Sequence, residues 1–520
     1  MLSDFLLQKQ SATLLSLTVD RYCFSLIYLN QRKKEKKAFL MKKSVKKFLS
    51  VFMAVVMVAL SGVTSFAMDE SEWATVFESA DAKAGLTVFV GSDESERNFT
   101  WYTEKENTPC VTVSADALFA DAEKFTGTTE KASDGDYVNH VTVTGLEYNT
   151  TYYYKATSGA YESEVYSFTT SSEKEFKAVY MTDIHISADS EENPDSIFNN
   201  SLNLNNALED AFARENDISV LLSAGDQASD GLECEYKGFS ISPLLKTISV
   251  ATSIGNHDRK GVEYKTYTNL PNEYEEAKIS SYIGDNYWFV KGDVLFLCVD
   301  TNNASGEDHA AFVQKAVNAN PDVKWKVLMA HHDLYSGRIP HRESENALIR
   351  MMWAPIVDEY GIDLVLLGHS HFYTVSNILY NNRTVAPLAT EMIDPAGTLY
   401  MVSCSINRPR EEEELGLNED VIGFDYLTLE PTYNILTCSE DSITVESYEV
   451  GAEDAFNSFT ITKTTKDGGH EYKENAILTM FNNLVRKIGT IYAFFNNIGR
   501  YSDLKEDGFD VDFFACVFGK

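Results

Sequence analysis

Apolar and polar residues alternate with a period of two through much of residues 70–172, and clusters of Gly, Ser, Asp and Asn separate the alternating runs. The runs are LTVFVGS (86–92), NFTWYT (98–103), CVTVSA (110–115), NHVTVTGL (139–146), TTYYYKAT (150–157) and EVYSFTT (164–170). No part of this region has the spacing of a long helix. Short strands at this density are typical of an all-β sandwich.

From about residue 173 to 465 the pattern changes to apolar strands that alternate with helical stretches. Apolar runs occur at 176–181, 218–223, 248–254, 294–299, 326–329 and 364–367, and residues 201–216 and 345–360 have helical spacing. This alternation predicts an α/β domain. The predicted organisation is therefore a sandwich at 68–172, an α/β domain at 173–465 and a helical tail at 466–520.

Polar clusters follow five of these apolar runs. They are Asp183-Ile184-His185, Gly225-Asp226, Gly255-Asn256-His257-Asp258, His331-His332 and Gly368-His369-Ser370-His371. Six of the ten histidines of the chain fall in these clusters. Because open α/β sheets bind ligands at the carboxyl ends of their strands, we expect the five loops to converge on one site.

The residue types in the clusters favour metal ions. Carboxylate, amide and neutral imidazole groups bind Mn, Zn or Fe rather than Cu(I). The set is too large for one tetrahedral ion, and a carboxylate such as Asp226 can bridge two ions. Two neighbouring divalent ions form the clamp used for in-line displacement at phosphorus. The pattern therefore predicts a dinuclear hydrolase of phosphate esters, without choosing among Mn, Zn and Fe.

Composition and charge limit the class of protein and the kinds of partner that it can bind. Of 520 residues, 44% are hydrophobic, which excludes a disordered chain. Residues 68–520 carry 33 Lys and Arg against 75 Asp and Glu. Such an acidic body repels polyanions, which argues against nucleic acid as a structural partner. Two bound cations would still allow a small phosphate ester to bind, because their local charge outweighs the distant net charge.

In this order, the five clusters resemble the signature of the calcineurin-like metallophosphoesterase superfamily. The strand-rich region before them makes the chain similar to purple acid phosphatases and their bacterial secreted relatives, and residues 146–152 resemble the tyrosine corner of fibronectin type III domains. The resemblance covers about residues 75–465 and implies a fibronectin type III-like sandwich before a four-layer αββα domain. It implies that Asp183, His185, Asp226 and His371 bind one metal, and that Asp226, Asn256, His331 and His369 bind the other.

The resemblance also implies roles around the substrate. His257, paired with Asp258, matches a histidine that contacts the phosphate and protonates the leaving oxygen during in-line attack by a metal-bound hydroxide. His331 aligns with the family ligand better than His332, although either could serve. The candidates for substrate contact are His341, Arg338 and His332, and an exposed polar loop is the alternative for the first two.

Two departures separate the chain from purple acid phosphatases. Those enzymes carry a tyrosine three residues after the aspartate of the GD cluster, where this chain has Ser229. They also lack the histidine found here at His185. We therefore expect a colourless enzyme that uses divalent metals. Tyr373, just after the last cluster, is a further candidate for lining the cleft.

Residues 41–67 have the layout of a secretory signal peptide. Four lysines precede an apolar stretch that begins at Phe48, and Ser65-Phe66-Ala67 has the small-x-small pattern of a cleavage site. Because a signal acts at the extreme N-terminus, we expect Met41 to be the true start and residues 1–40 to be a mis-assigned upstream segment. The mature protein would begin near Met68, secreted or at the surface of a bacterial cell. A membrane anchor is the alternative.

Residues 474–499 place apolar side chains at helical spacing. Two interpretations are open. The helix packs on the body of the protein, or it forms an amphipathic tail that contacts a membrane or a cell surface.

Together, these features predict a secreted, acid phosphatase-like enzyme that hydrolyses phosphomonoesters. A phosphodiesterase or nucleotidase is the main alternative, because the same metal ligands serve both reactions. A non-catalytic surface adhesin, with the sandwich and the tail as its working parts, is more remote because the ligand set is complete.

Overall fold

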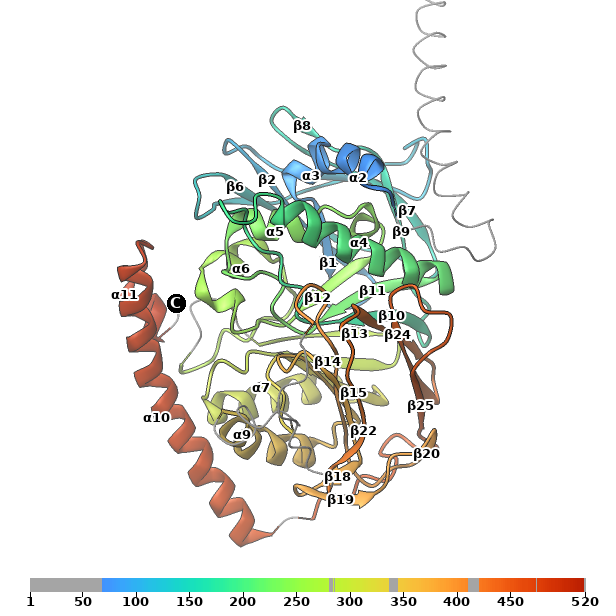
Figure 1. Ribbon diagram of the computed structural model, residues 1–520, viewed down its shortest axis with the longest axis vertical. Helices are drawn as coiled ribbons and strands as arrows, with labels where there is room; N and C mark the ends of the chain where they lie inside the picture. Colours follow the sequence, from blue (N-terminus) through green and yellow to red (C-terminus); the bar gives the residue numbers. More distant parts are fainter. Residues whose placement is uncertain are drawn as a thin grey trace, which may run out of the picture. The chain divides into compact units, whose positions relative to one another are not determined.

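The structure is a computed structural model that describes residues 68–279, 284, 286–335, 345–409, 420–473 and 475–518. The predicted signal peptide (41–67), the upstream segment (1–40) and two predicted substrate contacts, Arg338 and His341, lie outside the described residues. Residues 65–520 form one compact unit, whose described part is shown as a ribbon in Figure 1.

The first part of this unit is rich in β-strands. Two short helices that the sequence pattern did not predict precede the strands, α2 (Glu70–Phe77) and α3 (Ala80–Ala84). The strands are β1 (Thr87–Val90), β2 (Glu96–Thr103), β3 (Cys110–Ser114), β4 (Glu123–Thr126), β5 (Thr128–Lys131), β6 (Tyr137–Thr144), β7 (Thr151–Ser158), β8 (Tyr161–Glu162) and β9 (Tyr166–Thr169). One sheet contains β1, β2, β6 and β5, and a second contains β4, β3, β7 and β8, with β9 paired to β7.

The two sheets enclose an apolar core. Val88 and Trp101 come from the first sheet, and Val111 and Tyr154 come from the second; all four are buried in one cluster. At the predicted corner, the backbone N–H of Glu147 donates a hydrogen bond to the Tyr152 hydroxyl at 2.9 Å. A bond from this hydroxyl back to the upstream backbone defines a tyrosine corner. The predicted β-sandwich is therefore confirmed.

The α/β domain contains two further groups of strands. The first group is β10 (Phe176–Met181), β11 (Ile218–Ser223), β12 (Ser249–Thr252), β20 (Glu391–Ile393), β23 (Thr432–Cys438), β24 (Ser442–Glu449) and β25 (Asn457–Thr462). The second group is β13 (Tyr287–Lys291), β14 (Val294–Val299), β15 (Trp325–Ala330), β16 (Leu364–Leu367), β17 (Tyr373–Ser376), β21 (Leu399–Val402) and β22 (Ile422–Tyr426). A separate hairpin pairs β18 (Ile378–Tyr380) with β19 (Arg383–Ala386).

The sandwich and the α/β domain share one sheet. β1 pairs in parallel with β12, with Phe89 opposite Val250. The full strand order is β20-β25-β24-β23-β10-β11-β12-β1-β2-β6-β5, and the second sheet has the order β13-β14-β15-β16-β21-β17-β22. Within them, β10, β11 and β12 are parallel, as are β14, β15, β16 and β21.

Helices cover the outer faces of both sheets (Figure 1). They are α4 (Ser196–Arg214), α5 (Glu233–Phe239) and α6 (Glu263–Tyr267) on the first sheet, and α7 (Gly306–Ala319) and α9 (Glu345–Tyr360) on the second, with short 3-10 helices η1 (Pro243–Lys246) and η2 (Asp258–Lys260). A core that includes Tyr180 and Phe296 fills the space between the sheets, and two more apolar clusters lie beneath the helices. The predicted αββα arrangement is confirmed.

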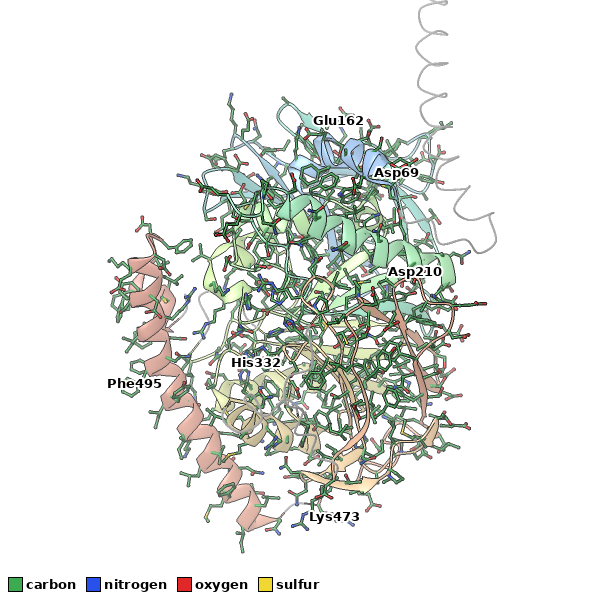
Figure 2. The ribbon with its side chains drawn as sticks, viewed as in Figure 1. Asp69, Glu162, Asp210, His332, Lys473 and Phe495 are labelled. Carbon is green, nitrogen blue, oxygen red and sulfur yellow. The ribbon has the colours of Figure 1, made fainter. Side chains whose placement is uncertain are left out.

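The C-terminal tail is helical, as predicted. α10 (Ala476–Glu506) spans 31 residues, and α11 (Phe513–Phe518) follows it. Val485, Gly489 and Ala493 are buried where α10 packs on the body of the protein beside α7 and α9. The helix also exposes large apolar side chains, among them Phe495 (Figure 2). In the described part of the chain, no helix has both the length and the apolarity to cross a bilayer.

A buried group of three charges ties the sandwich to the second sheet. The Glu94 carboxylate contacts Lys291 at the end of β13 and accepts a hydrogen bond from Arg97 of β2 at 2.7 Å. All three side chains are buried. Although burial acts to raise the pKa of Glu94, the charges of Lys291 and Arg97 lower it to about 2. Removing the carboxylate would leave the Arg97 charge buried without a counter-charge.

We expect Glu94→Gln to lower the free energy of unfolding by about 3 kcal/mol, the usual cost of breaking a buried ion pair. Urea titration followed by circular dichroism measures this difference. The exposed pair Glu78–Lys83 provides the control, and Glu78→Gln should change stability by less than about 1 kcal/mol. Because the pKa of Glu94 is depressed, its contribution is complete above about pH 4.5 and is lost as the pH falls towards 2. A difference that grows in acid would contradict this assignment.

Candidate metal centre

The five predicted clusters lie in the loops that follow β10, β11, β12, β15 and β16. Five of the predicted ligands adopt left-handed backbone conformations. The φ angles are 50° at Asp183, 51° at His185, 54° at Asp226, 72° at His369 and 60° at His371. Non-glycine residues rarely adopt such angles, and they concentrate at functional sites where the surrounding structure imposes them.

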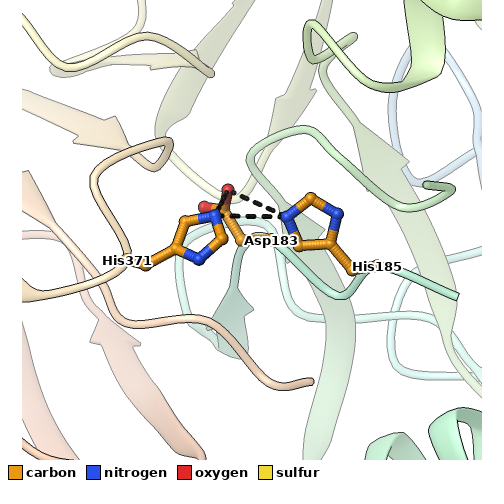
Figure 3. A group of neighbouring side chains, drawn as sticks. All are labelled: Asp183, His185 and His371. Carbon is orange, nitrogen blue, oxygen red and sulfur yellow. Dashed lines mark hydrogen bonds and ion pairs between the residues drawn. The ribbon is translucent and has the colours of Figure 1, made fainter. Parts of the chain in front are cut away.

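Asp183, His185 and His371 form a first group of converging side chains (Figure 3). The Nε2 atoms of His371 and His185 lie 3.0 and 3.7 Å from Oδ1 of Asp183, and 3.2 Å from each other. Oδ2 of Asp183 accepts hydrogen bonds from the Thr182 hydroxyl and the His369 amide, both at 2.8 Å. The carboxylate is therefore held so that Oδ1 and two imidazole nitrogens face one point.

A second group surrounds the side-chain oxygen of Asn256. Nε2 of His331 and Nδ1 of His369 lie 2.9 and 3.0 Å from Oδ1 of Asn256. On the far side of its ring, Nδ1 of His331 contacts the Ala224 carbonyl at 3.0 Å. A hydrogen bond of this kind fixes the tautomer and leaves Nε2 as the ligand atom.

Asp226 connects the two groups. Its Oδ2 lies 3.6 Å from Nε2 of His185 and 3.3 Å from Nε2 of His331. Its Oδ1 accepts the backbone N–H of His257 at 2.8 Å. One carboxylate oxygen thus lies between the first and second groups, which is the position that a ligand bridging two ions requires.

Burial and mutual charge control protonation in the cluster. Burial lowers the pKa of His185 well below its usual value, so this ring is neutral and retains a lone pair. Burial acts to raise the pKa of Asp226, but the neighbouring His331 holds it at about 2. Burial acts to lower the pKa of His331, but the charges of Asp226 and Asp183 outweigh burial and raise this pKa to about 10. A metal ion would displace that proton, because imidazole must be neutral to bind a metal.

The donor set fits divalent metal ions. In the described ranges, the buried Oδ1 of Asp183, which faces the two imidazole nitrogens, has no hydrogen-bond partner. Three overlapping groups place their ligand atoms within 4.8 Å of one another: Asp183, His185 and His371; His185, Asp226 and His257; Asp183, Asp226 and His331. Imidazole and carboxylate ligands together suit Zn, Mn or Fe.

Two glycines allow the loops to approach this closely. A Cβ atom on Gly255 would lie 2.0 Å from Oδ1 of Asp226, and one on Gly368 would lie 2.0 Å from the Thr182 hydroxyl oxygen and 2.5 Å from Oδ2 of Asp183. The glycines in the GNHD and GHSH clusters are therefore required by the packing of the ligand loops.

His257 lies next to the cluster, but the predicted pairing of its ring with Asp258 is wrong. Its Nδ1 contacts the Ser229 carbonyl at 2.7 Å, and its ring is perpendicular to that of His185 at 4.7 Å between centroids. Burial and the charges of Lys260 and Arg408 lower its pKa, against the opposing effect of Asp226. Nζ of Lys260 also lies 2.7 Å from this Nδ1, so the Ser229 carbonyl and Lys260 together engage Nδ1 and leave Nε2 available.

Asp258 instead organises the backbone of two ligand loops. Its carboxylate accepts the N–H groups of Asp226, Gly255 and Ala228 at 2.7, 2.9 and 3.0 Å, and the Tyr236 hydroxyl at 3.0 Å. Burial and the nearby Asp226 raise its pKa to about 7. A carboxylate engaged in four hydrogen bonds has a positioning role in the site.

The structure shows which of the remaining predicted residues reach the ligand cluster. Of the two adjacent histidines, His331 reaches the ligand cluster, whereas Nδ1 of His332 contacts the Thr301 hydroxyl at 2.7 Å and its ring lies 4.7 Å from that of His369. Tyr373 does not line a cleft. It is fully buried between the sheets, where its hydroxyl contacts Ser447 at 2.8 Å. A strand residue two positions beyond the last ligand points into the core because side chains alternate.

Sequence reasoning missed one charged neighbour of the site. Arg408 follows β21, and its charge lowers the pKa values of both His185 and His257. Its backbone carbonyl contacts Nδ1 of His371 at 2.7 Å, which leaves the Nε2 atom of His371 towards the metal centre. Residues 405–408 carry no recognisable motif, so no sequence signal marked them.

Two known families match the chain in these regions. The family described as calcineurin-like phosphoesterase matches residues 176–373, which include every predicted metal ligand. The purple acid phosphatase N-terminal domain matches residues 85–170, which form the sandwich. The chain therefore contains a calcineurin-like phosphoesterase domain preceded by a purple acid phosphatase N-terminal domain.

Individual relatives are distant. Two uncharacterized proteins of Mycobacterium tuberculosis, MT2654 and Rv2577, are each 26% identical over an alignment of 179 residues that covers 28% of this chain. The match spans about a third of the length of these relatives (33%).

Two solved structures share the fold. The purple acid phosphatase PPD1 from yellow lupin (Lupinus luteus) seeds superposes with a TM-score of 0.63 at 17% identity, covering 75% of this chain and 77% of that one. PhoD superposes with a TM-score of 0.51 at 13% identity, covering 80% and 99%. At these identities the structures establish the fold alone. Together with the matched family, the fold and the ligand cluster define a calcineurin-like phosphoesterase domain with a candidate metal centre.

Proposed function

We propose that this protein hydrolyses phosphomonoesters at a centre of two divalent metal ions. The observation that carries the proposal is Oδ2 of Asp226, which lies between the Asp183–His185–His371 group and the Asn256–His331–His369 group. We assign the first group and Asp226 to one ion, and Asp226 and the second group to the other. The ions would supply positive charge for the phosphoryl oxygens and activate a water molecule at neutral pH.

The residues of the chain contribute orientation and proton transfer. The Ala224 and Arg408 carbonyls hold the rings of His331 and His371 with Nε2 towards the centre. With Nδ1 of His257 held by the Ser229 carbonyl, the doubly protonated ring can transfer the proton on Nε2 to the departing alkoxide and return to its neutral form. Asp258 fixes the loops that carry Asp226 and Asn256 through backbone hydrogen bonds. We infer no covalent intermediate on the protein.

The matched purple acid phosphatase N-terminal domain favours monoesters over the alternative, a phosphodiesterase or nucleotidase. The first test compares nitrophenyl phosphate with bis(nitrophenyl) phosphate, using protein that begins at Met68, chelated and then reloaded with Mn, Zn or Fe(II). We expect metal-dependent turnover that is faster for the monoester. Faster cleavage of the diester would reassign the enzyme as a phosphodiesterase. If the reloaded protein binds no metal, the metal centre is contradicted and the adhesin alternative gains support.

We propose that the protein acts outside the cytoplasm, because residues 41–67 have the pattern of a cleaved signal. The backbone nitrogen of Met68 lies 3.1 Å from a carboxylate oxygen of Glu209. A free amino group at Met68 would therefore form an ion pair at its new terminus. Mass spectrometry of protein recovered from the medium should identify Met68 or a close neighbour as the first residue. Retention of Met41 would contradict cleavage.

We further propose that α10 binds the surface of a lipid membrane. Eight large apolar side chains on this helix are more than half exposed: Ile477, Met480, Phe481, Leu484, Ile488, Ile491, Tyr492 and Phe495. The two charged residues between 476 and 499 are Arg486, which pairs with Glu359 of α9, and the exposed Lys487; both are basic. Apolar and aromatic side chains combined with basic residues are typical of helices at membrane interfaces. A second copy of this acidic body would be repelled, whereas a bilayer accepts the apolar face.

Replacing Leu484 and Ile491 together by Gln should abolish sedimentation of the protein with vesicles of phosphatidylcholine. The loss of two large apolar side chains removes about 3–6 kcal/mol of transfer free energy. Leu118→Gln with Ile393→Gln is the matched control, because these side chains are 88% and 61% exposed on other elements. Should the wild-type protein stay in the supernatant and form a dimer that the α10 variant disrupts, a second copy would replace the membrane as the partner.

A further inference from the structure

The segment 405–408 lies directly on the loop that carries Asp183 and His185. The Ser405 hydroxyl donates to the Asp183 carbonyl at 2.6 Å, and the Asn407 side chain donates to the Ile184 carbonyl at 2.7 Å. The backbone N–H of Arg408 in turn donates to the Ser405 hydroxyl at 2.9 Å. These bonds fix the backbone of Arg408 beside the metal centre, independently of its side chain.

Two serines position the guanidinium group of Arg408. Its Nη2 donates to the Ser229 hydroxyl at 2.9 Å and lies 3.3 Å from the Ser187 hydroxyl, and the two hydroxyls are 2.7 Å apart. In the described part of the chain, both hydrogen bonds of the guanidinium go to neutral hydroxyls.

The guanidinium faces the side of the centre where His257 lies. Ser229 connects the guanidinium to His257, because its hydroxyl accepts a hydrogen bond from Nη2 of Arg408 and its carbonyl contacts Nδ1 of the His257 ring. A half-buried cation beside the residue assigned to the leaving group is suited to contact the phosphoryl group. Arginine presents several N–H donors in a plane and binds phosphate oxygens with two parallel hydrogen bonds.

We propose that Arg408 binds a non-bridging oxygen of the substrate's phosphoryl group and thereby favours phosphomonoesters over diesters. This inference rests on the proposed hydrolysis of phosphate esters at the same site. A monoester is a dianion with three non-bridging oxygens, whereas a diester is a monoanion with two. A fixed cation therefore stabilises the bound monoester more strongly. In a diester, the second ester group would also compete for the space that the guanidinium occupies.

The test combines catalysis with direct binding. For Arg408→Gln, we expect kcat/KM for nitrophenyl phosphate to fall about 10- to 100-fold, the range for losing a charged hydrogen bond, and that for bis(nitrophenyl) phosphate to fall less than about threefold. Calorimetric titration of the metal-loaded protein with inorganic phosphate should show affinity weakened by about tenfold or more. For Arg408→Lys, both kcat/KM for nitrophenyl phosphate and phosphate affinity should lie between those of Arg408→Gln and the wild type, because lysine keeps the charge and loses the planar donors.

Arg383→Gln is the matched control, since Arg383 is an exposed arginine of β19, and it should change neither measurement. Metal content must remain at two ions per chain in Arg408→Gln, because the backbone carbonyl that orients His371 is retained. Unchanged phosphate affinity, or an equal loss for both esters, would overturn the proposal and leave Arg408 with a structural role. If the wild type cleaves neither ester, the proposed function fails, while phosphate binding still decides the role of Arg408.

Discussion

Asp226→Asn should abolish metal-dependent hydrolysis and reduce the bound metal from two ions to one or none. Oδ2 of Asp226 lies between the two ligand groups, so removing its charge weakens both sites at once. Mutation of residues that only support metal ligands already lowers metal affinity or activity 10- to 100-fold. For a bridging ligand, we therefore expect kcat/KM to fall by more than about 1,000-fold. Plasma emission spectrometry of the reloaded protein measures the metal, and nitrophenyl phosphate turnover measures the activity.

Asp217→Asn is the control for this variant, because Asp217 precedes the same strand and its side chain is 61% exposed. It should retain both ions and full turnover. Without metal, Asp226→Asn should be less stable than the wild type, because the variant removes the buried charge that pairs with His331. Retention of two tightly bound ions by Asp226→Asn would show that the carboxylate does not bridge, and the division of the ligands into two groups would have to be redrawn.

His257→Asn should lower kcat by about 100- to 10,000-fold for an alkyl phosphate, the range for loss of a general acid, without changing the metal content. The effect should be much smaller for nitrophenyl phosphate, because a nitrophenolate leaves without needing a proton. Comparison of the two substrates at saturating concentration measures this difference. An unequal loss of kcat for the two substrates is expected only if His257 acts as an acid, because damage to the site as a whole would slow both substrates.

The metal content of His257→Asn separates two roles that the geometry allows. His257 contributes to one of the three groups that could hold an ion, together with His185 and Asp226. If one ion is lost, His257 is a ligand and not the general acid. If both ions stay but the two substrates slow equally, its role is to bind the phosphate. Protonation of the leaving group predicts retained metal and an unequal loss.

The local spacing of residues predicted most of the elements accurately. The strands β10, β11, β14 and β16 and the helix α9 coincide with the predicted runs, because continuous apolar segments bounded by glycine and polar residues leave little choice of conformation. The two short helices before the sandwich were missed, since Glu70–Phe77 and Ala80–Ala84 are too short to show periodicity. The sharing of one sheet by the two domains was also unforeseen, because the pairing of β1 with β12 joins residues far apart in the chain.

The sequence by itself predicted seven metal ligands and His257, because each follows an apolar run, and the structure brings these side chains together where the strands end. Tertiary structure decided the supporting contacts. Asp258 is adjacent to His257 in the chain, yet its carboxylate faces the backbone of its own loop and of the loop that carries Asp226. The choice of His331 over His332, the burial of Tyr373 and the place of Arg408 beside the centre likewise depend on how distant loops pack. The spacing of residues along the chain specifies which strand, helix or loop a residue belongs to. The direction and the neighbours of its side chain are set by packing between these elements.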